Sequence, residues 1–367
     1  MAPESTDDLT PPETLFVRDG TLGRIILNRP RAMNALTQGM VTTIAAQLAE
    51  WDVDPSVETV LIQGAGDRGL CAGGDIVSLY RDIRGAGDEA GQFWADEYAL
   101  NLQISTYSKP YVAIMDGVVL GGGVGVSAHG SVRVVTERTK IGMPEVGIGF
   151  VPDVGGTWLL ARAPGELGTH VGLTGGTFSG SDALELGLAD HFVASDHLAE
   201  FVESLGSMSV SDALLRFESD PPASELASSR RWIDECYNST DATEILARLT
   251  AAAEEDARAS AAVIRTKSPL AVAVTLESIR RARAAASLAD VLNQEYRVSL
   301  RFAAGGEMAE GIRAQVIDKD RQPHWSPATL AQVLAEDVDA YFTPLQRGEL
   351  GLSLPTTHAQ EKSGSRS

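Results

Sequence analysis

Short apolar runs rich in β-branched residues alternate with amphipathic stretches over the first half of the chain. One amphipathic stretch places Met40, Ile44, Leu48 and Trp51 at helical spacing behind Thr37, which predicts a helix over residues 37–51 with Thr37 as its cap. Repeated strand–helix–strand units of this kind predict crossover connections and an α/β core over residues 13–205. The predicted strands are residues 23–28, 59–63, 111–115 and 133–135.

The β-strand pattern fades after about residue 205, and helical periodicity takes over. Residues 287–290 resemble a capping box and are followed by an apolar stripe, which is typical of a packing surface. We therefore expect a helical C-terminal region over residues 206–349. Residues 1–12 and 350–367 are polar and rich in Ser, Thr and Pro, so they are predicted to be disordered tails. The predicted C-terminal helices span residues 209–217, 224–236, 242–263 and 270–285.

Composition and charge narrow the class of protein. The 367 residues carry a net charge of −20, which argues against binding to nucleic acid or to an anionic membrane surface. No apolar run reaches the roughly 20 residues that span a bilayer, and the N-terminus lacks the apolar segment of a secretory signal. The two cysteines, Cys71 and Cys236, make no disulfide framework or metal-ligand pattern. These features predict a cytoplasmic protein.

Glycines are concentrated at residues 121–125, directly after an apolar run. Four glycines in five residues are unfavourable in a helix, by about 1 kcal/mol each relative to Ala, so they indicate a close approach of the backbone to another group. Residues 126–129 look helical. A glycine-rich turn that leads into a helix exposes backbone N–H groups, which can hold an anion or polarise a carbonyl oxygen. Tight packing of a helix on a sheet explains the glycines equally well.

A second glycine cluster follows the predicted strand 59–63. Residues 64–69 match the GxGxxG pattern of dinucleotide-binding folds. However, Gly73 and Gly74 interrupt the helix that would hold the pyrophosphate, and the chain continues as a helix-like segment at 76–83 without the expected acidic residue after a second strand. We therefore favour a second site of close backbone approach at Gly73 and Gly74.

Two carboxylates, Glu145 and Asp153, lie among apolar residues and glycines. Acids in such surroundings tend to have raised pKa values, which suits general acid–base chemistry, and a pair in different environments can divide the two roles. Glu145 follows Pro144, and the residues alone slightly favour its interpretation as a first-turn helix residue. No nucleophile elbow and no histidine cluster with metal-ligand spacing is present in the sequence.

Four segments together resemble the crotonase (enoyl-CoA hydratase/isomerase) superfamily, in order and in spacing. They are residues 28–36, 71–76, 121–123 and 144–145. The resemblance implies a spiral of ββα units and a thioester carbonyl held between the backbone N–H groups of Gly74 and Gly122. It further implies an acyl-CoA substrate, no metal, and no cofactor apart from the coenzyme A of the substrate. The superfamily often forms trimers or hexamers, and the sequence leaves open whether this chain forms such a homo-oligomer.

The same resemblance assigns substrate contacts around these glycines. Backbone groups at Ala32 and Ala72 are placed at the adenine end of coenzyme A, and Gly73 and Asp75 lie in the matching motif. These roles are implied by the motif alone.

Within the superfamily, the chain is most similar to the 3-hydroxyisobutyryl-CoA hydrolase family, over about residues 15–335. Gly125 stands where hydratases carry a glutamate, whereas residues 144–156 resemble the hydrolase segment and place its acids at Glu145 and Asp153. Residues 96–98 resemble its acidic helix and make Glu97 a substrate contact. The implied reaction is thioester hydrolysis in valine catabolism, with Glu145 as nucleophile or general base. The alternatives are a hydratase or isomerase, or a catalytically silent acyl-CoA-binding protein.

Overall fold

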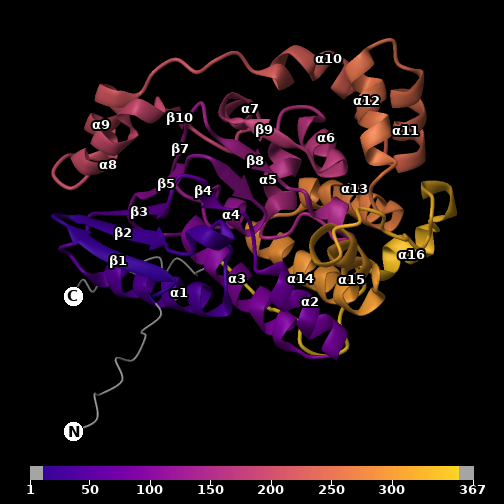
Figure 1. The fold of residues 1–367 in the computed structure, drawn as a ribbon, viewed down its shortest axis with the longest axis horizontal. Coiled ribbons are helices and arrows are strands. Elements are labelled where there is room, and N and C mark those ends of the chain that lie inside the picture. The colour runs from indigo at the N-terminus through magenta and orange to yellow at the C-terminus, as the bar shows by residue number, and fades with distance from the viewer. Residues whose placement is uncertain (1–10, 355–367) are drawn as a thin grey trace, which may run out of the picture.

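A computed structural model describes residues 11–354, which fold around two β-sheets (Figure 1). The six-stranded sheet has the order β1-β2-β3-β5-β7-β10, and the four-stranded sheet has the order β4-β6-β8-β9. Most of the two expected tails therefore falls outside the described residues. The strands are β1 (Thr14–Asp19), β2 (Leu22–Leu27), β3 (Thr59–Gly64), β4 (Gly69–Cys71), β5 (Tyr111–Met115), β6 (Val118–Leu120), β7 (Val132–Val135), β8 (Lys140–Gly142), β9 (Thr177–Ser179) and β10 (His191–Phe192).

Consecutive strands enter the two sheets in turn. The first strand of each pair, β3, β5 or β7, joins the large sheet, and the second, β4, β6 or β8, joins the small one. Within each sheet these strands pair in parallel, as crossover connections require. A helical segment follows each pair, so the predicted spiral of ββα units is confirmed. These segments begin with α2 (Ile76–Gly85), α4 (Gly122–Gly125) and a 3₁₀ turn at Glu145–Ile148.

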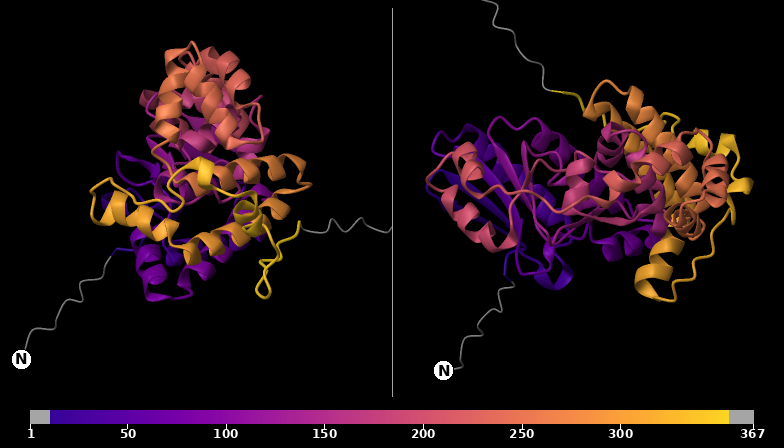
Figure 2. Two further views of the ribbon diagram at one scale, coloured as in Figure 1. Left: turned by 90° about the vertical axis from the view of Figure 1, so that its right-hand side faces the viewer. Right: turned by 90° about the horizontal axis from the view of Figure 1, so that it is seen from above.

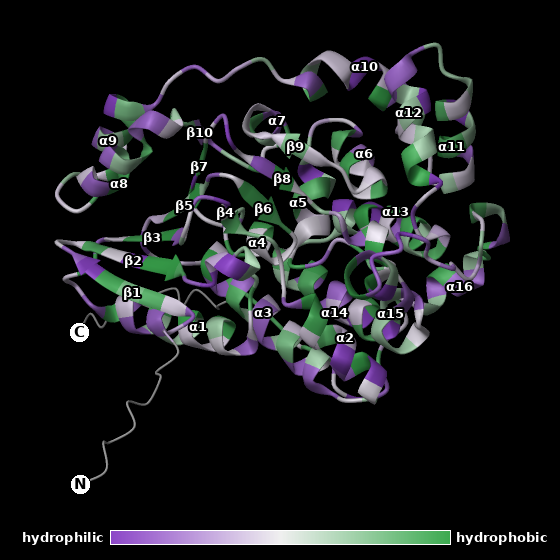
Figure 3. Ribbon diagram, viewed as in Figure 1, coloured by the Kyte–Doolittle hydropathy of each residue, from purple (hydrophilic) through white to green (hydrophobic). Residues whose placement is uncertain are grey.

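The sheets form because their strands are apolar on both faces. All five residues of β5 are buried, and Figure 3 shows the central strands as predominantly hydrophobic ribbon. Helix α1 (Gln38–Val53) begins where its pattern predicts, since the Thr37 side chain accepts a hydrogen bond from the Met40 N–H at 3.2 Å. The four predicted strands each coincide with an observed strand to within one residue at either end.

Helices dominate after β10, as expected. Figure 2 shows the orange and yellow C-terminal helices beside the α/β part. Helix α13 packs on α5 and α14 on α3, so these helices join the main hydrophobic core. The buried residues of α9 instead pack on the large sheet in a second apolar cluster. The boundary near residue 205 stays a prediction. The helices are α3 (Glu89–Ser105), α5 (Gly156–Arg162), α6 (Leu167–Thr174), α7 (Gly180–Glu185), α8 (Leu198–Ser204), α9 (Val210–Phe217), α10 (Glu225–Tyr237), α11 (Ala242–Ala251), α12 (Glu255–Ile264), α13 (Pro269–Ala284), α14 (Leu288–Gly305), α15 (Glu307–Ile312) and α16 (Ala335–Ala340).

Three local expectations were wrong. The helix predicted over 242–263 is two helices, because Ala252 adopts an extended conformation (ψ 148°) and the acidic start of α12 suits a new helix N-terminus. The helix expected at 126–129 lies instead at Gly122–Gly125, and residues 126–129 form turns. At Ser287 only half of the capping box forms, because the Asp290 carboxylate accepts from the Ser287 hydroxyl rather than from its N–H.

The second glycine cluster does not open a helix. Residues 64–69 run from β3 directly into β4, so the dinucleotide-binding alternative is contradicted. A Cβ at Gly64 would lie 2.3 Å from the carbonyl oxygen of Gly69, and this contact explains the glycine by packing. None of the helices between residues 11 and 354 is long and apolar enough to cross a membrane.

Candidate active site

Most of the predicted site residues line one cavity of about 140 Å³ between α3, the glycine turns after β4 and β6, and the 3₁₀ turn after β8. This volume is several times the roughly 30 Å³ that one water occupies in the liquid, so a short acyl group fits. Ala32 and Asp75 do not line the cavity. The lining comprises Ala72, Gly73, Gly74, Ile76, Leu79, Phe93, Trp94, Glu97, Gly121, Gly122, Pro144, Glu145, Ile148, Phe150, Asp153 and Met308.

Two unused backbone donors lie side by side in this wall. The N–H groups of Gly74 and Gly122 donate no hydrogen bond to any residue between 11 and 354. A Cβ at Gly122 would lie 3.3 Å from the Gly74 nitrogen, which shows how closely the two amides approach. Two adjacent donors of this kind can polarise one carbonyl oxygen. The structure thus shows, at Gly74 and Gly122, both the close approach of the backbone and the exposed N–H donors that the glycine clusters predict.

A neighbouring loop fixes the position of Gly73 and Gly74. The Leu36 N–H donates to the Gly73 carbonyl at 2.9 Å, and the Asp75 N–H donates to the Leu36 carbonyl at 2.9 Å. The Asp75 carboxylate caps α2 and pairs with Arg29 at 3.0 Å. Asp75 is thus tied into the fold beside the cavity, and its role as a substrate contact stays a prediction, as does that of exposed Ala32 in the turn Pro30–Ala32.

Glu145 is a buried acid at the start of its 3₁₀ turn. Its Oε2 atom has no hydrogen-bond partner within residues 11–354, and a Cβ at Gly121 would lie 2.8 Å from its Oε1. Burial, followed by the charge of Asp153, raises the pKa of Glu145 well above its ordinary value. Glu145 is therefore both a residue in the first turn of a helical segment and a buried acid at the cavity.

Asp153 is held by a chain of hydroxyl groups. The Tyr98 hydroxyl donates to Oδ2 of Asp153 at 2.8 Å, and the Ser299 hydroxyl lies 2.8 Å from the Tyr98 oxygen. Burial raises the pKa of Asp153 to about 7, although the Tyr98 hydrogen bond opposes this shift. Asp153 can therefore hold or release a proton near neutral pH.

Glu97 completes a group of three carboxyls around the cavity. Its Oε1 atom is buried without a partner in the described part of the chain, and a Cβ at Gly122 would lie 2.6 Å from that atom. Burial and the charge of Asp153 raise the pKa of Glu97 well above its ordinary value. Acids that are desolvated and unpaired at one cavity destabilise the fold, and this is typical of a functional site.

Sequence reasoning missed one further buried acid, Glu295 on α14. Only 1 % of its surface is exposed. Its carboxylate accepts hydrogen bonds from the Gly155 and Thr157 N–H groups at 2.6 and 3.0 Å, directly after Asp153 in the chain. The signal was available, because Glu295 falls within the apolar stripe of α14, where a charged residue is out of place.

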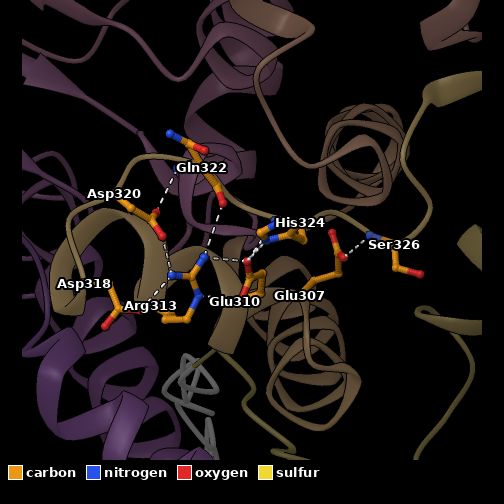
Figure 4. Close-up of polar contacts among 8 residues, drawn as sticks. All are labelled: Glu307, Glu310, Arg313, Asp318, Asp320, Gln322, His324 and Ser326. Atoms are coloured by element: carbon orange, nitrogen blue, oxygen red, sulfur yellow. Dashed lines mark hydrogen bonds and ion pairs between the residues drawn. The ribbon is translucent and has the colours of Figure 1, made fainter.

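Helix α15 packs against the Glu145 turn, and Figure 4 shows the polar contacts that fix α15 and the loop after it. A Cβ at Gly311 on α15 would lie 2.2 Å from the Ile148 carbonyl, so the two backbones touch. The Glu307 carboxylate binds the Ser268 hydroxyl and the Ser326 N–H. Arg313 holds the loop beyond α15 through four acceptors: Glu310, Asp318, Asp320 and the carbonyl of Gln322.

We expect Asp153→Asn to stabilise the protein increasingly as the pH rises. A carboxyl with a raised pKa makes the folded state bind more protons than the unfolded chain, so the free energy of unfolding falls with pH. For Asp153 this loss runs from its ordinary value of 3.8 to about pH 7. The asparagine cannot ionise, and its amide oxygen still accepts from Tyr98. Denaturant unfolding at pH 5 and pH 7.5 measures the effect, and a variant that is less stable than wild type at pH 7.5 contradicts it.

Comparison with known proteins places the chain among acyl-CoA enzymes. The family model described as enoyl-CoA hydratase/isomerase matches residues 22–342. Mitochondrial 3-hydroxyisobutyryl-CoA hydrolase from Danio rerio is 40% identical over 352 residues, covering 93% of this chain and 92% of the relative. The protein of the same name from Xenopus tropicalis is 38% identical over 352 residues, covering 93% and 91%.

Two solved structures share the fold closely and carry different names. A carnitinyl-CoA dehydratase from Mycobacterium thermoresistibile is 54% identical, with a TM-score of 0.89 over 92% of this chain and 98% of the other. An enoyl-CoA hydratase from Rhodobacter sphaeroides is 39% identical, with a TM-score of 0.86 over 91% and 98%. The similar proteins thus include hydrolases and enzymes that add or remove water.

Proposed function

Because the chain belongs to the enoyl-CoA hydratase/isomerase family, we propose that it is a thioester hydrolase that converts 3-hydroxyisobutyryl-CoA to 3-hydroxyisobutyrate and free coenzyme A. One observation carries the proposal. Glu145 is buried, and its Oε2 has no partner among residues 11–354. It lies against the glycine turn after β6, which presents the unused Gly122 N–H next to the unused Gly74 N–H of the turn after β4. A nucleophile or base beside a carbonyl-binding pair of donors is what acyl transfer requires.

The two N–H groups form the oxyanion hole of the proposed reaction. They bind the thioester oxygen and stabilise the negative charge that develops on it, each by roughly 3–4 kcal/mol. Ionised Glu145 either attacks the carbonyl carbon to form a mixed anhydride, which water then hydrolyses, or removes a proton from the attacking water. In both routes the C–S bond breaks, the thiolate leaves and is protonated, and the hydroxyl of water ends on the acyl group.

Asp153 lines the same cavity and serves this reaction as the second acid. Its pKa near 7 allows it to carry a proton at neutral pH, and Tyr98 fixes the direction of its carboxyl. It either orients the β-hydroxyl of the substrate or shares the acid–base work with Glu145. Glu97, with a free Oε1 atom beside Gly122, is the candidate for recognition of the same hydroxyl.

Water addition to a double bond is the competing activity, favoured by the names of the two solved structures. Hydratases of the resembled family use a glutamate at the position of Gly125. Here a Cβ at Gly125 would lie 2.7 Å from the Cβ of Val154 and 2.9 Å from Nδ2 of Asn101, so this position has no room for an acid side chain. The second acid of any reaction in this cavity has to come from Asp153 or Glu97.

Thiol release from a panel of short acyl-CoAs tests the proposed substrate class. We expect 3-hydroxyisobutyryl-CoA and 3-hydroxypropionyl-CoA to release free thiol faster than isobutyryl-CoA and propionyl-CoA, which lack the hydroxyl group. A buried acid left without its hydroxyl partner disfavours the deoxy compounds, whereas one methyl group is worth only about 1–3 kcal/mol. Equal rates with and without the hydroxyl would remove the basis for hydroxyacyl recognition.

We expect the pH dependence of kcat/KM to show an acid limb well above that of a free glutamate. Glu145 acts in its ionised form, and burial together with the charges of Asp153, Glu295 and Glu97 raises its pKa above the ordinary 4.5. Activity therefore rises with pH over a range that lies above the ordinary titration of a glutamate. In Asp153→Asn the residual activity should have its acid limb at lower pH, because one neighbouring negative charge is gone. An acid limb at 4.5 in wild type contradicts this account.

The location and the oligomeric state of the protein stay predictions. The cytoplasmic location rests on sequence features alone, and the curated relatives reported above are mitochondrial proteins. The trimer or hexamer rests on the resemblance, and size-exclusion chromatography with light scattering would measure it.

A further inference from the structure

The backbone directly after Asp153 is strained. Val154 has a φ of +54°, in the left-handed region, although β-branched residues avoid this region. Gly155 follows with a φ of +75°. Such strain persists only where surrounding contacts impose it, and it is often found beside functional groups. The contacts that impose it here are therefore informative.

Glu295 makes the strongest of these contacts from a helix 140 residues away in sequence. Its Oε2 accepts from the Gly155 N–H at 2.6 Å, and its Oε1 accepts from the Thr157 N–H at 3.0 Å and the Thr157 hydroxyl at 2.5 Å. Gly155, Thr157 and Glu295 are all buried. The carboxylate thus binds three donors within the first residues of α5 and fixes the chain on the C-terminal side of Asp153.

A histidine holds the strained residue itself. The His129 Nε2 lies 2.7 Å from the Val154 carbonyl oxygen, so this nitrogen carries the proton and donates it. Burial lowers the pKa of His129 to about 4, and the ring is therefore neutral at physiological pH. A Cβ at Gly155 would lie 2.6 Å from the same Nε2, so the ring is packed directly against this backbone.

Helix α14 also reaches the side chain of Asp153. Ser299 lies one helical turn beyond Glu295 and therefore on the same face. Its hydroxyl is hydrogen-bonded to Tyr98, which donates to the Asp153 carboxyl. One face of α14 thus holds Asp153 at two points, by its carboxyl through Tyr98 and by its following backbone through Glu295.

We propose that Glu295 is a positioning residue, which sets the direction of the Asp153 carboxyl in the cavity by fixing the strained backbone at residues 154–157. It touches no substrate atom, since it does not line the cavity. This inference depends on one part of the proposed function, which is that Asp153 takes part in catalysis. A carboxyl displaced by about 1 Å can reduce turnover by about 10²-fold without weakening substrate binding.

Glu295→Gln is the primary test, because it keeps the shape of the side chain. The amide oxygen can still accept from Thr157, but the NH₂ group then meets the Gly155 N–H, and two donors face each other. We expect kcat to fall by about 10- to 100-fold while KM changes by less than about twofold. Thr157→Val removes only the hydroxyl donor and should lower kcat by a smaller factor in the same direction. Thr157→Val also replaces Glu295→Gln as the test variant if Glu295→Gln does not fold.

Ser287→Ala is the matched control. It removes the side-chain cap of the same helix, whose Oγ accepts from the Asp290 N–H at 3.2 Å. The Ser287 side chain forms no hydrogen bond to Asp153 or to residues 154–157. We expect it to lower the stability of α14 but to leave kcat within about twofold of wild type. A similar fall in kcat in this variant would mean that Glu295 supports the helix and no more, which overturns the proposal.

Amide hydrogen exchange of residues 153–157 tests the hydrogen bonds between Glu295 and this backbone independently of any substrate. We expect faster exchange of the Gly155 and Thr157 amides in Glu295→Gln and unchanged exchange in Ser287→Ala. Unchanged protection in Glu295→Gln overturns the proposal whatever the activity. Activity ratios are taken on the acyl-CoA that wild type converts fastest. A failure of 3-hydroxyisobutyryl-CoA as substrate is therefore seen in wild type alone, and a failure of the positioning role is seen in the ratio of variant to wild type.

Discussion

Glu145→Gln is expected to reduce kcat for thiol release from 3-hydroxyisobutyryl-CoA by about 10³-fold or more. The amide can neither attack the carbonyl carbon nor accept a proton from water, and general base or nucleophilic catalysis supplies an effect of this order. The buried carboxyl is replaced by an amide of almost the same shape, so KM should change little. Steady-state kinetics with a thiol reagent measures the effect.

Glu137→Gln is a suitable control for that experiment. Its carboxylate is on the surface, binds Ser195 and lies outside the cavity lining, so its loss should leave kcat unchanged. Thiol release by Glu145→Gln at the wild-type rate would contradict the central role of this residue.

Gly122→Ala should abolish most of the activity for a steric reason. The new Cβ would lie 2.6 Å from Oε1 of Glu97, 3.2 Å from Cδ1 of Leu36 and 3.3 Å from the Gly74 nitrogen. The Glu97 carboxyl has to move away from the new methyl group, and the tight contact with the Gly74 nitrogen pushes apart the two donors that hold the thioester oxygen. Loss of one such donor costs about 10²–10³-fold in kcat, so a loss at least this large is expected.

A glycine that lacks neighbours provides the matched substitution. A Cβ at Gly85, the last residue of α2, would meet no atom within 4 Å. Gly85→Ala should therefore leave kcat and stability close to those of wild type. If Gly122→Ala retained full activity with an intact fold, the proposed oxyanion hole would have to be placed elsewhere.

Much of the fold could be predicted because its signals are local. Residues 111–115 form a strand as expected, since an apolar β-branched run has few alternatives, and Thr37 caps α1 as its position before the apolar pattern predicts. The break at Ala252 was missed, because helical periodicity continues on both sides of it. The short strands β4, β6 and β8 were missed because three residues carry too little pattern.

In the candidate site, only the residues that belong to recognisable motifs could be predicted from the sequence. Gly74, Gly122, Glu145, Asp153 and Glu97 all line one cavity, as the resemblance implied. Composition alone could not decide whether the glycines served packing or binding, and the structure shows close packing together with backbone donors that have no acceptor among residues 11–354.

Glu295 shows the limit of reading along the chain. Its partners, Gly155 and Thr157, lie about 140 residues earlier, and such a contact exists only once α14 has docked beside α5. A charged residue within an apolar stripe indicates a buried partner, but it does not say which partner.

The products formed from 3-hydroxyisobutyryl-CoA by the wild-type protein test the central claim most directly. Thiol detection and mass spectrometry on one reaction follow the C–S bond and the loss of water together. The account predicts one free thiol and one molecule of 3-hydroxyisobutyrate per substrate consumed, with no unsaturated thioester. Accumulation of the dehydrated acyl-CoA without thiol release would contradict it, and would assign the buried acids to the removal of water instead.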